Sequence, residues 1–124
     1  MATVQPGERY TALTGADLRG KRYHIVKFDS NCNIVLASAG SDTLIGVLDY
    51  EPRTAVDSVD VVLANGAGTF KVKTATNLAA GVLITANANG QAVLATTGQK
   101  VIGRTLRASV AGEIAEYYKL DTVA

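Results

Sequence analysis

Short runs in which hydrophobic and polar residues alternate follow one another along most of the chain, and turn-forming residues separate them. The runs contain many Val, Ile and Thr residues, which suit the half-buried, pleated surface of a β-strand. The intervening Gly, Asn and Asp residues supply the backbone conformations that tight hairpin turns need. The pattern therefore predicts nine strands, at residues 23–28, 34–37, 43–50, 58–64, 69–73, 82–86, 92–95, 101–106 and 113–120.

Residues 1–20 are different, because they show no sustained hydrophobic period. Pro6 and three glycines interrupt this segment. Its apolar residues follow neither the period of a strand nor that of a helix. We expect residues 1–20 to form a flexible N-terminal arm without order of its own, with at most one helical turn at residues 17–19. Residues 21–124 are then expected to form a single β domain.

The strand region contains an internal repeat. Val35, Leu36, Ala37 and Gly40 recur 58 residues later as Val93, Leu94, Ala95 and Gly98, and Ile45 with Gly46 recurs 57 residues later as Ile102 with Gly103. A chance alignment of two hairpins in an Ala-, Val- and Gly-rich chain is the alternative. Two copies are too few for a solenoid. The sequence thus predicts an all-β fold, a compact barrel- or sandwich-like domain built from two similar halves at about residues 23–64 and 81–120.

Length, charge and composition narrow the function. The 124 residues fit one domain, and twelve basic against eleven acidic residues give a net charge of +1. This charge creates no field that would hold a polyanion, so nucleic acid is not expected as a partner. The lone Cys32 cannot form an internal disulfide, which favours synthesis in a reducing cytoplasm. No secretory signal and no run of about 20 apolar residues is present, so we expect neither export by that route nor membrane insertion.

Candidate chemistry is sparse. His24 is the single histidine, and it has no partner at a spacing typical of metal ligands. A nucleophile set of Cys32, His24 and Asp29 can be written down, but neighbouring residues on one hairpin rarely orient a base toward a nucleophile. The Gly66-Ala67-Gly68 run lacks the Lys and the helix of a phosphate loop, so it is interpreted as a hairpin turn. We therefore expect no enzyme, and no catalytic, metal-binding or cofactor-binding residue.

The motifs of the repeat carry a family resemblance. The run from Val35 through Gly40 to Gly46, its second copy from Val93 to Gly103, and the strand at residues 60–63 resemble the capsid decoration (cement) proteins of tailed bacteriophages. The resemblance spans about residues 23–120. It implies a structural virion protein, made in the host cytoplasm, that binds the outer surface of an expanded capsid and stabilises it. The implied partners are the major capsid protein and further copies of this chain, often as homotrimers at three-fold sites of the shell.

The resemblance also implies an arm that becomes ordered by adding to strands of the shell, which is β-augmentation. Basic residues concentrate near the start of the chain, where they could steer the arm toward an acidic surface or simply keep it solvated. Tyrosine offers rigid apolar area with a polar tip and suits an interface. The candidate capsid-contacting residues are Val4, Gln5, Pro6, Tyr10, Arg19 and Arg22.

Other interpretations remain at this stage. A tail or fibre component of a phage has a similar composition rich in Ala, Gly and Thr. A ligand-binding β-sandwich is another alternative, although Trp is absent and the neighbouring Tyr117 and Tyr118 would point to opposite faces of a strand.

Overall fold

The computed structural model describes residue 5 and residues 7–124, and within this part of the chain it contains ten β-strands and no helix. Val4 and Pro6, two of the candidate contact residues, lie outside the described residues. The strands are β1 (Arg9–Leu13), β2 (Ile25–Phe28), β3 (Ile34–Leu36), β4 (Leu44–Leu48), β5 (Ser58–Leu63), β6 (Thr69–Lys73), β7 (Leu83–Ala86), β8 (Ala92–Leu94), β9 (Lys100–Thr105) and β10 (Ile114–Val123). Nine of them coincide with the nine predicted strands, with ends that differ by a few residues.

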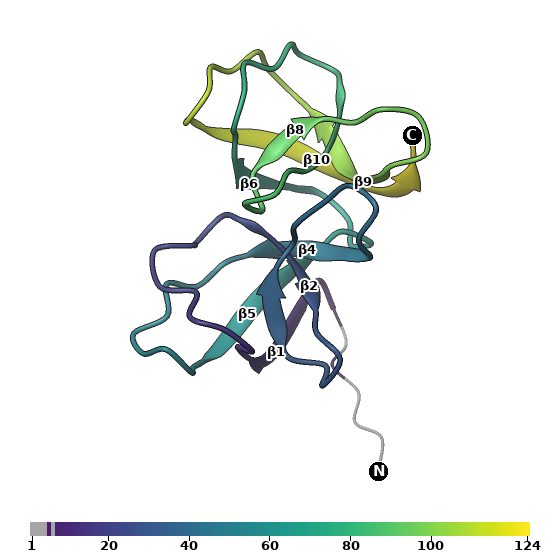
Figure 1. Ribbon diagram of the computed structural model, residues 1–124. Helices are drawn as coiled ribbons and strands as arrows, with labels where there is room; N and C mark the ends of the chain where they lie inside the picture. Colours follow the sequence, from purple (N-terminus) through teal and green to yellow (C-terminus); the bar gives the residue numbers. More distant parts are fainter. Residues whose placement is uncertain (1–4, 6) are drawn as a thin grey trace.

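The strands form two five-stranded antiparallel sheets with the same topology, in the orders β1-β5-β4-β2-β3 and β6-β10-β9-β7-β8. Figure 1 shows them as two lobes stacked on each other. In each lobe a parallel bridge connects the end of the first strand to the third strand, Thr14 to Ile34 and Thr74 to Ala92. Each sheet therefore curls toward closure, as in a small barrel. The predicted all-β fold with two similar halves is confirmed.

The halves are longer than the predicted repeat. Residues 69–73 lie between the two predicted halves, and in the structure they form β6, the opening strand of the second sheet. Its counterpart in the first sheet is β1 at Arg9–Leu13, where no strand was expected. That expectation is wrong from Arg9 onward. The strand escaped detection because only Tyr10 and Ala12 turn inward, and two half-buried residues make too short a pattern.

Residues that follow β1 are also part of the folded lobe. Leu18 is only 1% exposed and belongs to the hydrophobic cluster inside the first sheet. The helical turn expected at residues 17–19 does not form; instead the Lys21 N–H donates to the Leu18 carbonyl in a tight turn. Burial of the Leu18 side chain contributes about 1.5–3 kcal/mol and so helps to anchor this segment on the lobe.

The two lobe interiors are packed differently at equivalent positions. The first lobe is filled by aliphatic residues, among them Val59 and Val61 on β5. The strand registers place Ala115 and Tyr117 of β10 at the same two positions in the second lobe. Tyr117 is fully buried. The larger Tyr117 beside the smaller Ala115 keeps the filled volume similar, as close packing requires.

One hydrophobic cluster continues across the contact between the lobes. It joins Ile25, Leu44 and Val47 of the first lobe to Val72, Ile102 and other residues of the second. Main-chain hydrogen bonds cross the same contact, from Ile25 N–H to the Gly90 carbonyl (2.6 Å), from Lys73 N–H to the Tyr23 carbonyl (2.8 Å) and from Lys100 N–H to the Gly40 carbonyl (2.9 Å). The lobes therefore share apolar surface and hydrogen bonds, and neither lobe keeps its full core without the other.

The repeated Ile-Gly motif has a steric cause. Gly46 lies in β4 and Gly103 in the equivalent place in β9. A Cβ atom on Gly46 would strike the Val62 carbonyl oxygen, and one on Gly103 would strike the Tyr118 carbonyl oxygen of the neighbouring strand. The neighbouring strand thus approaches so closely at these two glycines that no larger residue fits.

Candidate functional site

Asp49 organises the surface at the end of β4. Its carboxylate accepts a hydrogen bond from Arg22 at 3.0 Å and another from Arg9 of β1. The Asp49 side chain is 11% exposed, whereas the two arginines are about half exposed. The hydrogen bond from Arg22 to Asp49 raises the pKa of Arg22 above its usual value. The Arg22 guanidinium also lies 4.9 Å from the centre of the Tyr23 ring, at cation–π distance.

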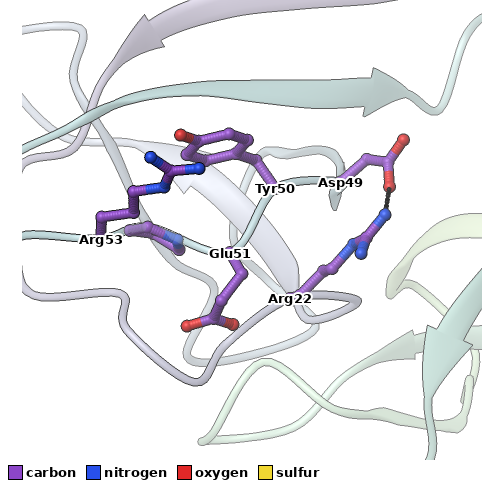
Figure 2. Close-up of a pocket in the computed structure, with 6 residues that line it drawn as sticks. Arg22, Asp49, Tyr50, Glu51 and Arg53 are labelled. Carbon is purple, nitrogen blue, oxygen red and sulfur yellow. Dashed lines mark hydrogen bonds and ion pairs between the residues drawn. The ribbon is translucent and has the colours of Figure 1, made fainter.

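An open cleft of about 390 Å³ lies beside this ion-pair cluster, lined by Arg22, Asp49, Tyr50, Glu51, Pro52 and Arg53. Figure 2 shows Arg22 directed toward Asp49, with Tyr50 and Glu51 pointing to opposite sides of the chain. The Glu51 carboxylate accepts the Gly20 N–H and so connects this cleft to the segment after β1. Charges of both signs and a tyrosine suit contact with a polar protein surface better than capture of an apolar small molecule.

Gln5 forms the second feature of this region. Its side-chain oxygen accepts the Thr11 N–H at 2.8 Å, and its side-chain nitrogen donates to the Thr11 carbonyl at 3.0 Å. β1 is an end strand of its sheet, so these Thr11 groups face the open edge. The amide of Gln5 therefore occupies the place that a neighbouring strand would take.

Two other candidate contact residues lie apart from that edge contact. Tyr10 is half-buried on the inner face of β1 and packs edge-to-face on Phe28, with ring centres 5.6 Å apart. Arg19 is exposed and pairs with Asp17 at 2.7 Å. That hydrogen bond and ion pair lower the pKa of Asp17 to about 2. Of the described candidates, only Arg22 joins the Asp49 cluster and only Gln5 covers the β1 edge, while Tyr10 serves the fold of the first lobe.

The residues considered for nucleophilic chemistry have separate structural roles. Asp29 accepts the N–H groups of Asn31 and Asn33 and so stabilises its own turn. His24 is 6% exposed, and its Nδ1 lies 3.3 Å from the Arg22 carbonyl oxygen. Cys32 is exposed at the tip of the turn with a φ of 61°. Among residues 5 and 7–124, no hydrogen bond joins these three side chains.

Two further findings concern the described part of the chain. It contains no group of three or more His, Cys, Asp or Glu side chains placed to hold a metal ion. In residues 5 and 7–124 there is also no helix long and apolar enough to cross a membrane. The residue that sequence reasoning missed is Asp49, the centre of the ion-pair cluster. Its signal was weak, because the partners Arg9 and Arg22 are far away in the chain and meet Asp49 only after β1 pairs with β5.

Fold and surface together define an all-β protein made of two similar five-stranded lobes, with its charged cluster and open strand edge on the first lobe. No protein-family model matches the chain, and no curated protein matches it in sequence.

Proposed function

We propose that this protein is a capsid decoration protein, a structural virion component that binds the outer surface of an expanded phage capsid and stabilises it. The proposal rests on the resemblance of the repeat motifs to that family and on the open edge of β1. Its partner is the major capsid protein, and the location is the outside of the virion. The all-β fold agrees with the compact β domain that the resemblance implies.

The open edge of β1 is the observation that carries this proposal. Thr11 directs its N–H and carbonyl to a side chain, Gln5, instead of to a strand. A side-chain amide has one donor and one acceptor in the arrangement of a peptide group, but it satisfies a single residue of the edge. A strand of the shell that displaced Gln5 would continue the first sheet through several main-chain hydrogen bonds.

The arginines next to the β1 edge also favour this surface as the site of capsid contact. Arg9 lies on β1, and it shares the Asp49 carboxylate with Arg22. The Arg9 and Arg22 side chains are each about half exposed, and each guanidinium has further donors for carboxylates of a partner. Many weak contacts of this kind become strong when copies bind a repeating lattice, because the effective concentration is high.

A sedimentation assay tests the proposal. Purified protein is mixed with expanded, undecorated heads and, separately, with unexpanded precursor shells of the source phage, and the bound fraction is measured. We expect saturable binding to expanded heads alone. A deletion that tests the N-terminal segment must leave β1 in place, so it cannot extend as far as Thr14. A chain starting at Gly7 keeps β1 and removes Gln5.

A matched pair of substitutions tests the edge itself. Thr11→Pro removes the outward N–H, which an added strand needs, while the pairing of β1 with β5 remains. Thr11→Val removes only the hydroxyl, which bonds to Asp60, and keeps the N–H. We expect Thr11→Pro to bind heads at least about tenfold more weakly than Thr11→Val. Equal binding of the two variants would show that this edge is not used, and no binding of the wild type to either shell would refute a decoration role.

A further inference from the structure

The chain contains two Asn-Gly pairs, Asn65-Gly66 and Asn89-Gly90, and both asparagines are exposed in turns between strands. At such a pair the main-chain nitrogen of the glycine can attack the side-chain carbonyl carbon of the asparagine, because glycine has no Cβ atom to hinder ring closure. Ammonia leaves, and water opens the resulting cyclic imide to aspartate or isoaspartate. The two pairs offer the same local chemistry, so the fold decides how each of them reacts.

The fold holds the Asn89-Gly90 pair in place. The Asn89 N–H donates to the Asn87 Oδ1 at 2.9 Å, and the Gly90 carbonyl accepts the Ile25 N–H at 2.6 Å. Gly90 is buried, and a Cβ atom on it would lie 2.8 Å from the Ile25 carbonyl oxygen and 3.5 Å from that of Ala37. These bonds oppose the rotation that ring closure needs, and the two oxygens oppose negative charge on the Gly90 nitrogen.

The Asn65-Gly66 pair is held much less firmly. It lies in the segment that joins β5 to β6, and therefore joins the first lobe to the second. The Gly66 N–H donates to the Leu63 carbonyl at a long 3.3 Å. Within residues 5 and 7–124, neither the main-chain N–H nor the side chain of Asn65 makes a hydrogen bond. Rotation of Asn65 toward the Gly66 nitrogen therefore breaks few contacts.

A buried positive charge lies beside Gly66. The Lys119 side chain is 2% exposed, and a Cβ atom on Gly66 would lie 3.1 Å from the Lys119 Nζ. The carboxylate of Glu8 is 4.0 Å from this Nζ, beyond hydrogen-bond distance. Ring closure develops negative charge, first on the glycine nitrogen and then on the oxygen of the tetrahedral adduct. A cation that is shielded from bulk water stabilises such charge more than an exposed one does.

We propose that Asn65 is a self-modification site, at which the Gly66 nitrogen displaces ammonia with electrostatic help from Lys119. Hydroxide takes the Gly66 N–H proton, the nitrogen bonds to the Asn65 Cγ, and the bond from Cγ to the amide nitrogen breaks as ammonia leaves. Water then adds to either carbonyl of the imide and breaks its bond to the ring nitrogen. Opening at Cγ gives aspartate, and opening at the main-chain carbonyl gives isoaspartate. In total, a water molecule is consumed and an ammonia molecule is released, without any oxidant or reductant.

The product changes the junction between the lobes. Asn65 and Asp121 line the same open cleft of about 260 Å³, so the reaction brings a second carboxylate to this cleft. Isoaspartate also adds a methylene group to the main chain between β5 and β6. The reaction needs this chain and water alone, so it is independent of capsid binding.

Ageing of the purified protein at neutral pH, followed by peptide mass mapping, tests the proposal. We expect Asn65 to convert at least about tenfold faster than Asn89, with isoaspartate among the products. Lys119→Met keeps the length of the side chain without its charge and should slow conversion of Asn65 at least about threefold. Arg107→Met is the matched control, because Arg107 is an exposed cation beyond the end of β9, and it should leave the rate unchanged.

Two further measurements separate the charge of Lys119 from its packing. Lys119→Arg keeps the charge and should retain the wild-type ratio of the Asn65 rate to the Asn89 rate. In urea, which removes the fold, both asparagines should convert at similar rates and Lys119→Met should have no effect. Equal rates at Asn65 and Asn89 in the folded protein, or aspartate as the sole product, would overturn the proposal. An equal slowing by Lys119→Met and Lys119→Arg, or no slowing by Lys119→Met, would refute the role of the Lys119 charge.

Discussion

Asp29 and Asn87, 58 positions apart, cap equivalent turns with the same atom. The Oδ1 of Asp29 accepts the N–H groups of Asn31 and Asn33 at 2.8 and 2.9 Å. The Oδ1 of Asn87 accepts the N–H groups of Asn89 and Gln91, both at 2.9 Å. A charged and a neutral side chain thus accept equivalent hydrogen bonds. The turn therefore depends on an oxygen acceptor at this distance from the backbone and not on a negative charge.

This equivalence predicts the effect of substitutions in the turn. Asp29→Asn should change the free energy of unfolding by less than about 0.5 kcal/mol, because the amide oxygen replaces the carboxylate oxygen. Asp29→Ala and Asn87→Ala each lose two hydrogen bonds and should destabilise the protein by about 1–2 kcal/mol. Urea unfolding followed by circular dichroism measures the differences. Equal losses for Asp29→Asn and Asp29→Ala would mean that charge, not the acceptor, stabilises the turn.

Gly90 is predicted to be irreplaceable at the contact between the lobes. Its φ is 69°, and an added Cβ would lie 2.8 Å from the Ile25 carbonyl oxygen of the first lobe. Gly90→Ala should destabilise the protein by about 1–3 kcal/mol, through backbone strain and the clash. Cys32 has the equivalent place in the first lobe, with a φ of 61°, and is exposed. Cys32→Gly should therefore leave the melting temperature unchanged or raise it slightly, and a large loss would contradict the equivalence of the two turns.

Tyr117 is predicted to contribute through its ring and not through its hydroxyl. The ring is fully buried, and among the described residues the hydroxyl has no hydrogen-bond partner. Tyr117→Phe should keep or increase stability, because it removes a buried polar group that is unpaired. Tyr117→Val introduces the residue that the first lobe has at this position. It should lower the free energy of unfolding by about 2–4 kcal/mol, because a valine beside the small Ala115 would leave a cavity. A destabilised Tyr117→Phe variant would reveal a hydrogen bond to a bound water molecule.

Burial also raises the pKa of Tyr117 well above its usual value. A spectrophotometric titration of the native protein should therefore show that one of the five tyrosines stays protonated until the protein unfolds in alkali. The Tyr117→Phe variant should lack this late step.

His24 predicts a pH dependence of stability. Burial lowers the pKa of His24 below its usual 6.5, an effect that the nearby Arg22 carbonyl partly opposes and the positive charge of Lys21 reinforces. The unfolded chain takes up the proton near pH 6.5 and the folded protein resists it, so stability is full above that pH. It should fall as the pH drops from about 6.5 through the lower folded value. Chemical unfolding at pH 7.5 and 5.5 should show this loss for the wild type and a smaller one for His24→Gln; identical losses would assign the effect to other groups.

Local pattern was enough to predict most strands of this protein. Alternation and turn residues located β2 to β10, because each of these strands has at least two strongly apolar positions or a clear turn at its ends. The repeat was visible for a local reason as well. Gly46 and Gly103 recur because the close approach of the neighbouring strand excludes a Cβ atom, and Asp29 and Asn87 recur because each turn needs an acceptor.

Long-range pairing decided what local pattern missed. β1 becomes a strand because β5 offers it a ladder of hydrogen bonds, although Tyr10 and Ala12 alone carry too little pattern. Likewise, only the approach of Arg9 and Arg22 makes Asp49 the centre of an ion-pair cluster. Neither feature has a signal within a few residues, since the partners are distant in sequence.

By itself, the sequence determined the fold class, the internal repeat with its two copies, and the turns, because these depend on residues within one hairpin. The tertiary structure alone decided where each half begins, which equivalent surfaces are covered, and which remain exposed. The Ile25 face of the first lobe is covered because the second lobe packs on it, whereas Leu106, Ile114 and Tyr118 remain exposed. The reason is physical: equivalent residues in a repeat share local structure, but burial depends on what packs against them, and that is a property of the whole folded chain.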